Sequence, residues 1–343
     1  MNTIETEATR AIYARVRLFT SIVGLVLAAI LMTAGPAWAN SFGKDHIFVY
    51  DSVWRDGDVL EYDPAGNFVR SFRANLPDTY RMSGPGHLRW GPDGHLYQFG
   101  ELDRGDGAGG TTGVLEWEAG GHLVAFQPTP EWLDCGGFAV LDNGNWAITS
   151  WDGTDTYLKE YARDFSESWD FTGGPFDNQG LYMHEGMLYN AQNHEVAVWD
   201  PASRTFAYSF VTSEDNNDLA VSAAGMVAVN FQWHDPDRPD YVEIFDSNGT
   251  WLHAASLTDN DLIASRGIGF LSDGSMLVAS GYDFGAGAWD PKLAIYDSDF
   301  AFVGLLELDR WREPGSIAVG IPEPATVALL ALGAIAALRR RAR

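Results

Sequence analysis

Short apolar runs alternate with tight polar turns along most of the chain. Between Ile268 and Leu308 the pattern occurs twice: an apolar run, a short turn rich in Asp, Ser or Gly, and a second apolar run. Within the runs apolar and polar residues alternate with a period of two, which predicts antiparallel strands joined as hairpins. The central part of the sequence shows no 3.6-residue apolar period, so the pattern predicts an all-β fold.

One kind of hairpin recurs six times and carries an aromatic residue directly before its turn. These aromatic residues are Tyr62, Trp117, Tyr161, Trp199, Phe245 and Tyr296. Subtracting consecutive residue numbers gives spacings of 55, 44, 38, 46 and 51 residues. A repeat near this length that holds four short strands is typical of the blades of a β-propeller.

A second kind of hairpin alternates with the first and has a glycine in its turn. These glycines are Gly94, Gly144, Gly186, Gly225 and Gly274. Glycine suits a hairpin turn that needs positive φ. The sequence holds six hairpins of the first kind but only five of the second. The two strands that would form the sixth lie apart in the sequence, at 47–51 and 316–320. If these strands pair, the last strand completes the first blade and removes two exposed sheet edges. The sequence therefore predicts a six-bladed propeller from about Phe42 to Gly320, closed by this pairing.

The repeated hairpins resemble those of the NHL-type and gluconolactonase-like six-bladed propellers. The resemblance is carried by the pattern apolar-x-Asp-Gly-x-apolar, as in Ile268–Leu277, and by the pattern Val-x-x-aromatic-Asp-x-x-Gly, as in Val242–Gly249. It covers about 280 residues, which is the difference between the ends of the predicted propeller. It implies the architecture more than the activity, because this scaffold hosts hydrolases, lyases and binding proteins.

Residues 1–39 have the three parts of an export signal. Three arginines, Arg10, Arg15 and Arg17, precede a mostly apolar run from Leu18 to Met32. Ala37 and Ala39 then place small residues where signal peptidase requires them. A retained membrane anchor is the alternative, but the short apolar run and the Ala-x-Ala site favour cleavage before Asn40.

The C-terminal residues also have three parts in a fixed order. Pro322-Glu323-Pro324 comes first, an apolar run from Ala325 to Leu338 follows, and the basic residues Arg339, Arg340, Arg341 and Arg343 come last. This order closely resembles the PEP-CTERM sorting signal. We therefore divide the chain into a signal peptide (1–39), the propeller (40–320) and a sorting segment (321–343).

The resemblance to PEP-CTERM proteins implies how the chain is handled. It implies processing by an exosortase in a Gram-negative bacterium, after transient anchoring in the inner membrane through an apolar transmembrane helix. Arginines after that helix stay on the cytoplasmic side, so the propeller faces outward. Proteins with this tail accompany exopolysaccharide production and biofilm matrix, which implies a location at the envelope, the cell surface or outside the cell. A plain C-terminal anchor is the alternative.

The charge of the chain narrows the choice of partners. There are 47 acidic and 22 basic residues, for a formal net charge of −25. A surface this acidic repels phosphates, so nucleic acid is excluded as a partner of the propeller. The single cysteine, Cys135, cannot form an internal disulfide, so the fold depends on packing.

Long loops are expected to gather at one end of the central channel, because the turns within hairpins are short and lie at the other end. Loops that lead into the innermost strands bring oxygen-bearing side chains to this mouth: Asp134, Asp177, Asn178, Asn217 and Asp218. Such a ring could hold Ca²⁺ or another divalent cation. The alternative is that these side chains only make hydrogen bonds within turns. Gluconolactonase-like enzymes hold a catalytic metal here, but several aligned positions are glycine (Gly137, Gly180, Gly267 and Gly315), so no ligand is transferred from them.

Other residues of the same loops suit an organic ligand. The candidates are His87, Trp151, Trp233, His234, Arg266 and Trp289. Exposed aromatic faces beside acids can stack on sugar rings and accept hydrogen bonds from their hydroxyls. Packing between blades is the alternative for each aromatic residue.

The sequence favours a binding protein over an enzyme. It contains no Gly-x-Ser-x-Gly, His-Glu-x-x-His or phosphate-binding loop. The leading hypothesis is an exported, exosortase-sorted, non-catalytic propeller that binds a glycan or protein, with exopolysaccharide or a surface protein as its partner. The alternative is a metal-dependent lactonase or related hydrolase with its site at the channel mouth.

Overall fold

The computed structural model describes most of the predicted propeller. The described residues are 42–51, 58–72, 80–104, 110–130, 133, 136–151, 153–175, 179–231, 240–260, 262, 265–283, 288–312 and 314–320. The predicted signal peptide with Ala37 and Ala39, and the predicted apolar C-terminal helix, lie outside them. Within the described residues, no helix is long and apolar enough to cross a membrane.

The described residues form antiparallel sheets and one short 3₁₀ turn, η1 (Thr258–Asn260). The first sheet has the order β22 (Pro314–Val319), β1 (Ile47–Asp51), β2 (Val59–Tyr62) and β3 (Phe68–Phe72). The second contains β4 (Tyr80–Trp90), β5 (Leu96–Arg104), β6 (Gly110–Trp117) and β7 (Leu123–Pro128). The third contains β8 (Gly137–Val140), β9 (Trp146–Trp151), β10 (Thr156–Tyr161) and β11 (Ser168–Asp170).

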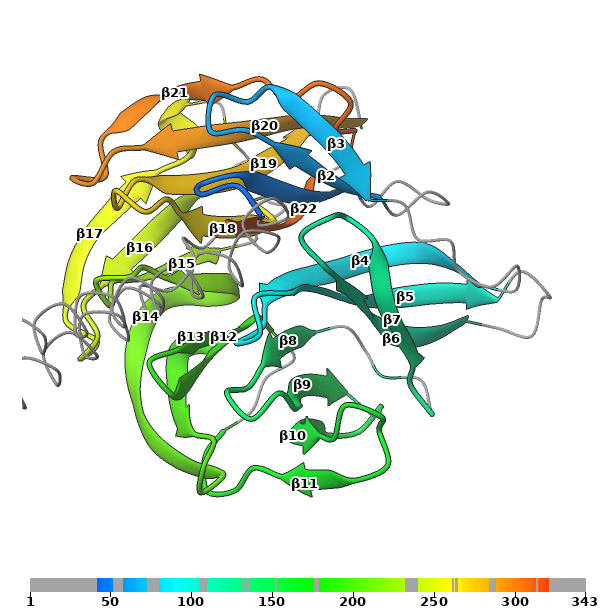
Figure 1. The fold of residues 1–343 in the computed structure, drawn as a ribbon. Helices are drawn as coiled ribbons and strands as arrows, with labels where there is room; N and C mark the ends of the chain where they lie inside the picture. The colour runs from blue at the N-terminus through cyan, green and yellow to red at the C-terminus, as the bar shows by residue number, and fades with distance from the viewer. Residues whose placement is uncertain are drawn as a thin grey trace, which may run out of the picture. The chain divides into compact units, whose positions relative to one another are not determined.

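The remaining strands form a sheet of six and a sheet of four. The larger sheet contains β12 (Leu181–His184), β13 (Met187–Asp200), β14 (Thr205–Val221), β15 (Val227–Phe231), β16 (Tyr241–Phe245) and β17 (Trp251–Ser256). The last contains β18 (Gly267–Phe270), β19 (Met276–Asp283), β20 (Ala288–Tyr296) and β21 (Phe302–Leu306). The sheets follow one another as the blades of a β-propeller (Figure 1).

The prediction of six separate blades is wrong, because the described residues form five sheets. The long strand β14 joins two of the predicted units. Its first half pairs with β13, as in Val196↔Phe210, and its second half pairs with β15, as in Leu219↔Val229. The segment between these halves, 211–217, contains neither glycine nor proline. Nothing in its sequence therefore breaks the strand where a separate blade was expected to begin.

The predicted closure between the two ends of the propeller is confirmed. Strand β22 pairs with β1 in the register Ile47↔Val319 and Val49↔Ile317. Two further backbone hydrogen bonds extend the pairing, from Asp45 N to Gly320 O (3.1 Å) and from Gly320 N to His46 O (2.7 Å). The closing strand also contacts both neighbouring innermost strands, β4 and β18.

The predicted turn glycines are confirmed as well. All five have positive φ, from 78° at Gly94 to 92° at Gly274. At this conformation a side chain would be strained, so glycine is the residue that lets each hairpin reverse tightly. The hairpin turns lie at the end of the strands away from the loops that lead into β8, β12 and β18, and we call this end the turn face.

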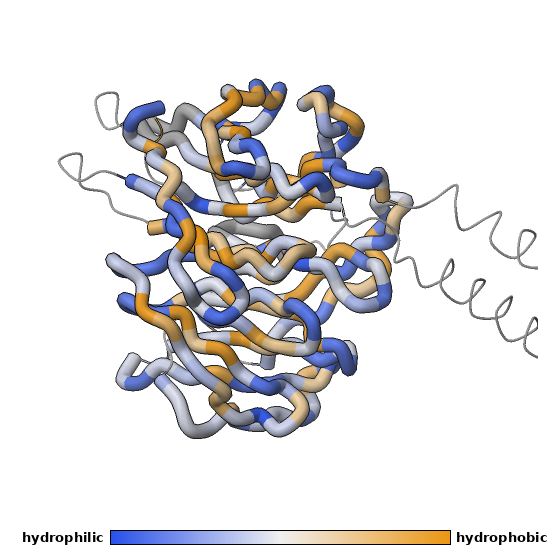
Figure 2. The backbone as a smooth tube through the Cα atoms, turned by 90° about the vertical axis from the view of Figure 1, so that its left-hand side faces the viewer, coloured by the Kyte–Doolittle hydropathy of each residue, from blue (hydrophilic) through white to orange (hydrophobic). Residues whose placement is uncertain are grey.

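The core lies between the faces of neighbouring sheets. Apolar stretches occupy the strands and hydrophilic residues occupy most turns (Figure 2). Trp117 packs between the first two sheets with Phe48, Phe72 and Leu88, and its side chain is fully buried. Most of the large aromatic residues in the described part are buried in such clusters, so they contribute to packing between sheets.

Buried glutamates at one strand position connect neighbouring sheets. Glu160 of β10 accepts hydrogen bonds from Asn143 and Asn145 of its own sheet and from Arg204, which belongs to the turn between β13 and β14. Glu116 of β6 is bound in the same way by Arg163, from the turn after β10 (2.6 Å). Burial acts to raise the pKa of the Glu160 carboxyl, but the hydrogen bonds from Arg204, Asn145 and Asn143 outweigh it and lower that pKa below 4.5.

This arrangement predicts a pH-dependent contribution of Glu160 to stability. A lowered pKa stabilises the fold above the unfolded-state value, and the stabilisation is lost as the pH falls through the folded-state value. Glu160→Gln is expected to lower the free energy of unfolding by about 2–3 kcal/mol at pH 7. Denaturant unfolding should show this difference shrinking as the pH drops below 4.5. Glu167→Gln, in an exposed turn, is the control and should change stability by less than about 0.5 kcal/mol. A Glu160→Gln deficit that stays constant down to pH 3 would contradict this account.

Candidate functional site

The innermost strands of the sheets, such as β4, β8, β12 and β18, converge at the end of the propeller opposite the turn face. We call this end the mouth. Glycines stand where these strands begin to approach one another. A Cβ on Gly137 would lie 2.1 Å from the carbonyl oxygen of Gln179, and one on Gly180 would lie 2.9 Å from the Cα of Asp218. A Cβ on Gly267 would lie 2.8 Å from the carbonyl oxygen of Gly315. These glycines therefore allow neighbouring strands to meet closely, and this is why the sequence has no metal-ligating side chain at those positions.

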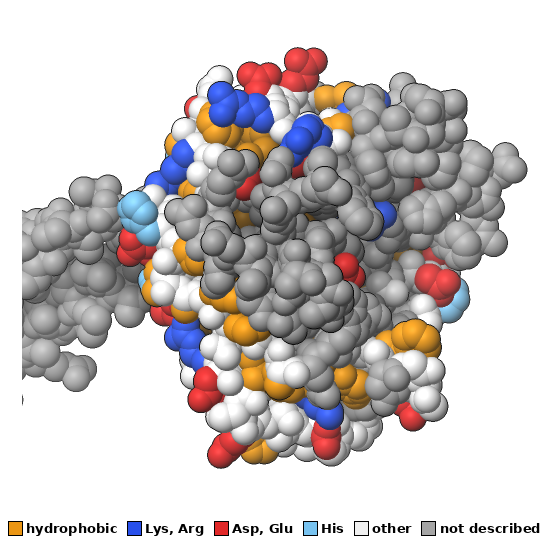
Figure 3. Space-filling model, turned by 90° about the vertical axis from the view of Figure 1, so that its right-hand side faces the viewer, with side chains coloured by type: hydrophobic (Ala, Val, Ile, Leu, Met, Phe, Trp, Pro, Cys, Tyr) orange, Lys and Arg blue, Asp and Glu red, His pale blue; other side chains and the backbone are white. Residues whose placement is uncertain are grey.

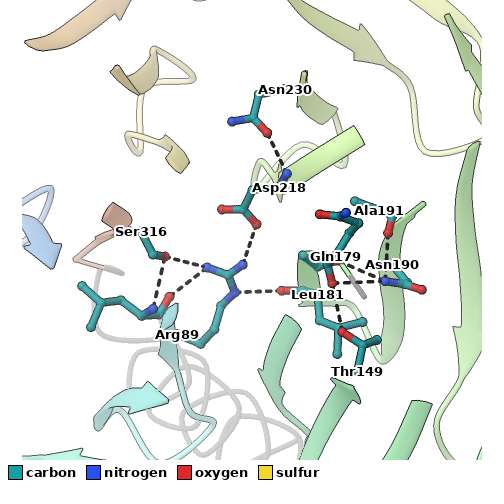
Figure 4. Close-up of polar contacts among 11 residues, drawn as sticks. Arg89, Thr149, Gln179, Leu181, Asn190, Ala191, Asp218, Asn230 and Ser316 are labelled. Carbon is teal, nitrogen blue, oxygen red and sulfur yellow. Dashed lines mark hydrogen bonds and ion pairs between the residues drawn. The ribbon is translucent and has the colours of Figure 1, made fainter. Parts of the chain in front are cut away.

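The side chain of Arg89 crosses the centre of the propeller below the mouth. From β4, its Nε donates to the carbonyl oxygen of Leu181 in β12 (2.7 Å). Its Nη2 donates to Oδ1 of Asp218 in β14 (2.8 Å), and its Nη1 donates to Leu88 O (2.9 Å) and to Oγ of Ser316 in β22 (3.2 Å). Figure 4 shows the guanidinium between these groups. One side chain thus joins strands from three different sheets, and we call this set of contacts the Arg89 clasp.

The clasp is an almost completely buried ion pair. Arg89 is 5% exposed and Asp218 is 2% exposed. Arg89 also lies 5.7 Å from the ring centre of Tyr182, and burial raises the pKa of this tyrosine. Because each charge is balanced by the other and most polar atoms are hydrogen-bonded, the pair can be buried, whereas either charge alone would be strongly destabilising.

Uncharged side chains satisfy the backbone near the mouth. Asn190 Nδ2 lies 3.4 Å from Gln179 O and 3.3 Å from Gly180 O, and Thr149 Oγ1 donates to Gln179 O (3.1 Å). Gln192 Nε2 donates to Pro175 O (2.8 Å) and to Asn190 Oδ1 (3.0 Å). These contacts hold the backbone before β12 against strands β9 and β13. The polar side chains here therefore stabilise the backbone at the mouth.

Two asparagines beside the clasp keep polar atoms without a partner. Asn230 accepts a hydrogen bond at Oδ1 from the backbone N–H of Asp218 (2.7 Å), but its buried Nδ2 has no partner among the described residues. Asn216 donates from Nδ2 to Gln192 O (2.6 Å) and Glu195 O (2.8 Å), but its buried Oδ1 has no partner there either. Buried polar atoms are nearly always hydrogen-bonded, so these two atoms are among the exceptions in the described residues.

The structure places some of the ligand-face candidates from the sequence. Trp151 ends β9 on the mouth side and is 52% exposed. His87 is half-buried in β4, and the backbone N–H of Arg266, before β18, donates to Ala279 O (2.8 Å). Only the backbone of Trp289 is described, and Trp233 and His234 lie outside the described residues.

The predicted cation ring stays a prediction. Asp134, Asp177 and Asn178 lie outside the described residues, so the structure does not bring the set together. The carbonyl oxygen of Asn217 accepts from Gly180 N (3.0 Å), and Asp218 is paired with Arg89. The positive charge of Arg89 on this carboxylate disfavours a cation at Asp218.

A separate group of possible metal ligands lies at the turn face. The ligand atoms of Asp93, His95 and Glu116 lie within 4.8 Å of one another. However, Arg163 Nη2 donates to Glu116 (2.6 Å). Nη1 of the same guanidinium lies 3.6 Å from Oδ2 of Asp93. The guanidinium already supplies the positive charge that a metal ion would bring, so this group joins two sheets.

The local pattern gave one weak sign of the clasp. Arg89 is a charged residue inside the apolar triplet Leu88–Trp90, where the corresponding innermost strands have the uncharged residues Ala139, Tyr182, Ala220 and Gly269. A single charged side chain at this position indicates that it has a partner near the centre. Its partners could not be named, because the pairing with Asp218 spans 129 positions.

Comparison with known proteins identifies the C-terminal residues and the fold. Residues 320–342 match the PEP-CTERM protein-sorting motif. No curated protein matches the chain. The motif indicates an exported protein that is processed by exosortase and sorted to the cell envelope.

Several solved structures share the propeller fold at low sequence identity. The β-propeller domain of Cps50 (Swd1) from Myceliophteria thermophila is 13% identical, with a TM-score of 0.51 over 80% of this chain and 87% of that one. TolB from Acinetobacter baumannii is 11% identical, with a TM-score of 0.54 over 81% of this chain and 66% of that one. A functionally unknown protein from Desulfotomaculum acetoxidans is 10% identical, with a TM-score of 0.53 over 82% and 100%. These similarities show the fold alone, and the resemblance to NHL-type and gluconolactonase-like propellers stays a prediction.

The Arg89 clasp predicts a large, non-additive effect on stability. Arg89→Met leaves the Asp218 carboxylate buried without its partner and is expected to cost about 3–5 kcal/mol of unfolding free energy. Adding Asp218→Leu removes the unpaired buried carboxylate and should recover at least half of the lost unfolding free energy. Denaturant unfolding of the two single variants and the double variant measures this coupling.

The matched control for this prediction is Lys159→Met. Its ammonium lies 3.8 Å from Asp170, whose side chain is exposed to solvent, so the variant should lose less than about 1 kcal/mol. Additive losses at Arg89 and Asp218, or a loss at Arg89 no larger than at Lys159, would show that the clasp contributes little.

Proposed function

We propose that this exported propeller binds a neutral glycan at its mouth and performs no chemistry on it. The observation that carries the proposal is the pairing of Asp218 with Arg89. The Asp218 carboxylate is neutralised by this ion pair, so it is a poor metal ligand and a poor general base. The neighbouring side chains of Asn230 and Ser316 are polar and uncharged, which suits recognition of hydroxyl groups.

Two further features support a neutral sugar. Trp151 exposes half of its surface on the mouth side, and a flat aromatic face can stack on a sugar ring. The net charge of −25 opposes acidic polysaccharides. On the face shown in Figure 3, acidic and basic side chains are interspersed, so the described residues there form no basic patch for a polyanion. The sorting motif is consistent with a protein that meets extracellular polysaccharide, and this partner is part of the proposal.

Binding is tested with purified full chain and defined sugars. Cellotriose, mannotriose and galactotriose are titrated in a calorimeter, with trigalacturonic acid as the acidic comparison. At least one neutral trisaccharide should bind, and the acidic one should not. Trp151→Ala should weaken binding about tenfold by removing the stacking surface.

The matched control is Trp251→Ala. Trp251 is 55% exposed, close to the value for Trp151, but it lies on the outer strand β17. It should leave the affinity unchanged within twofold. Equal losses for the two variants would argue against a site at the mouth, and metal-dependent hydrolysis of a lactone would favour the competing hydrolase.

The sorting segment makes a separate prediction about processing. Replacing Pro322, Glu323 and Pro324 with alanine should leave the chain uncleaved and associated with the membrane, because the recognition motif is lost. Immunoblots of membrane and extracellular fractions detect the retained, longer chain. Asp299→Ala, in an exposed turn, should be processed normally. Release of the triple variant at the normal size would contradict a role for the motif.

A further inference from the structure

The orientation of the Asn230 amide is fixed by its surroundings. Its Oδ1 accepts the backbone N–H of Asp218 at 2.7 Å, so the oxygen and nitrogen of the amide cannot be exchanged. Its Nδ2 is therefore a donor, fully buried, and it has no partner among the described residues. A buried N–H in this position needs an acceptor, and none of the described residues supplies one.

Asp218 supplies an acceptor next to this donor. Its Oδ1 is bound by Arg89, and none of its described contacts involves Oδ2. In Figure 4 this second oxygen and the Nδ2 of Asn230 point to the same side. The two residues are opposite one another on paired strands, in the register Asp218↔Asn230. The Asn230 amide nitrogen and the Asp218 oxygen that is not bound to Arg89 thus belong to side chains that are neighbours across two paired strands.

A hydroxyl group satisfies both atoms at once. It can donate its proton to the carboxylate oxygen of Asp218 and accept a hydrogen bond from the Asn230 amide. A cation fits poorly, because the amide presents its hydrogens and Arg89 already neutralises the carboxylate. An anion fits poorly as well, because it would face the carboxylate oxygen. The chemistry therefore selects an uncharged group that both donates and accepts.

A further buried atom without a partner among the described residues belongs to Asn216, on the same strand as Asp218. Asn216 is 2% exposed and precedes Asp218 by two positions in β14. Its amide nitrogen donates to Gln192 O and Glu195 O, so the atom left over is an acceptor, Oδ1. Asn216 and Asp218 of β14, together with Asn230 of β15, thus offer one donor and two acceptors, which suits a polyol better than a ligand with a single polar group.

We infer that Asp218 and Asn230 together bind one hydroxyl group of a neutral sugar at the inner end of the mouth. This inference rests on the proposed glycan binding and names the atoms that recognise the ligand. Asp218 acts as the acceptor and Asn230 as the donor. Arg89 is a positioning residue, since it holds the carboxylate without contacting the sugar.

The test compares two variants of the full chain with the wild type. Asn230→Asp keeps the oxygen that accepts from the Asp218 backbone and replaces the donor nitrogen with an oxygen. Asn248→Asp makes the same chemical change in the exposed turn between β16 and β17. With whichever of cellotriose, mannotriose and galactotriose binds most tightly, Asn230→Asp should weaken binding at least tenfold, and Asn248→Asp should stay within twofold.

A series of deoxy sugars tests the same contact first in the wild type and then in the variant. The methyl glycoside of the bound sugar is compared with analogues that each lack one hydroxyl. One analogue should bind the wild type at least tenfold more weakly than the parent, and this difference should disappear in Asn230→Asp. If Asn230→Asp does not fold, Asn230→Ser replaces it in the comparison.

The outcomes separate this inference from the proposed function. If the wild type binds a trisaccharide and Asn230→Asp binds it equally well, the unpartnered atoms hold only water and the inference is overturned while glycan binding stands. A deoxy series in which every analogue binds within threefold of the parent overturns it too. If the wild type binds none of the three trisaccharides, both proposals fail.

Discussion

The innermost strands of a propeller must converge on one centre, and this constraint determines much of the chemistry there. Glycines at Gly137, Gly180 and Gly267 let the backbones approach within contact distance. Close approach leaves carbonyl groups facing the centre, and buried carbonyls need donors. The guanidinium of Arg89 supplies donors to two of these carbonyls and to the side chains of Asp218 and Ser316. The centre is therefore polar because close packing of the strands places backbone carbonyl groups there, and these groups need hydrogen-bond donors.

Local patterns were sufficient to predict the hairpins, the turn glycines and the pairing of the two end strands. Each of these depends on residues that are close in sequence or on the need to avoid an open sheet edge. The number of blades was missed because β14 continues through 211–217 without a break, and spacing alone cannot show whether two sheets remain separate. Regular aromatic spacing therefore identified the repeat but not the boundary between two of its copies.

The candidate site was predictable only in part. The sequence placed Asn217 and Asp218 at the mouth and proposed oxygen ligands for a cation. It could not show that Arg89, 129 positions earlier, neutralises Asp218. Nor could it show that Asn230 and Asn216 are buried with unpartnered atoms, since this depends on the register between β14 and β15. The long-range pairing with Arg89 makes Asp218 a poor cation ligand, whereas the predicted ring as a whole stays a prediction.

The direction of β22 also has a consequence for how the protein is displayed. This strand begins at the mouth and ends at Val319, and the backbone of the next residue, Gly320, is bound to Asp45 and His46 at the turn face. Asp45 in turn contacts Ser272 in the turn between β18 and β19. The first and last described residues of the propeller thus emerge together, on the side away from the mouth. A protein held through its C-terminal side would present the mouth outward, and a large ligand could reach it without passing the point of attachment.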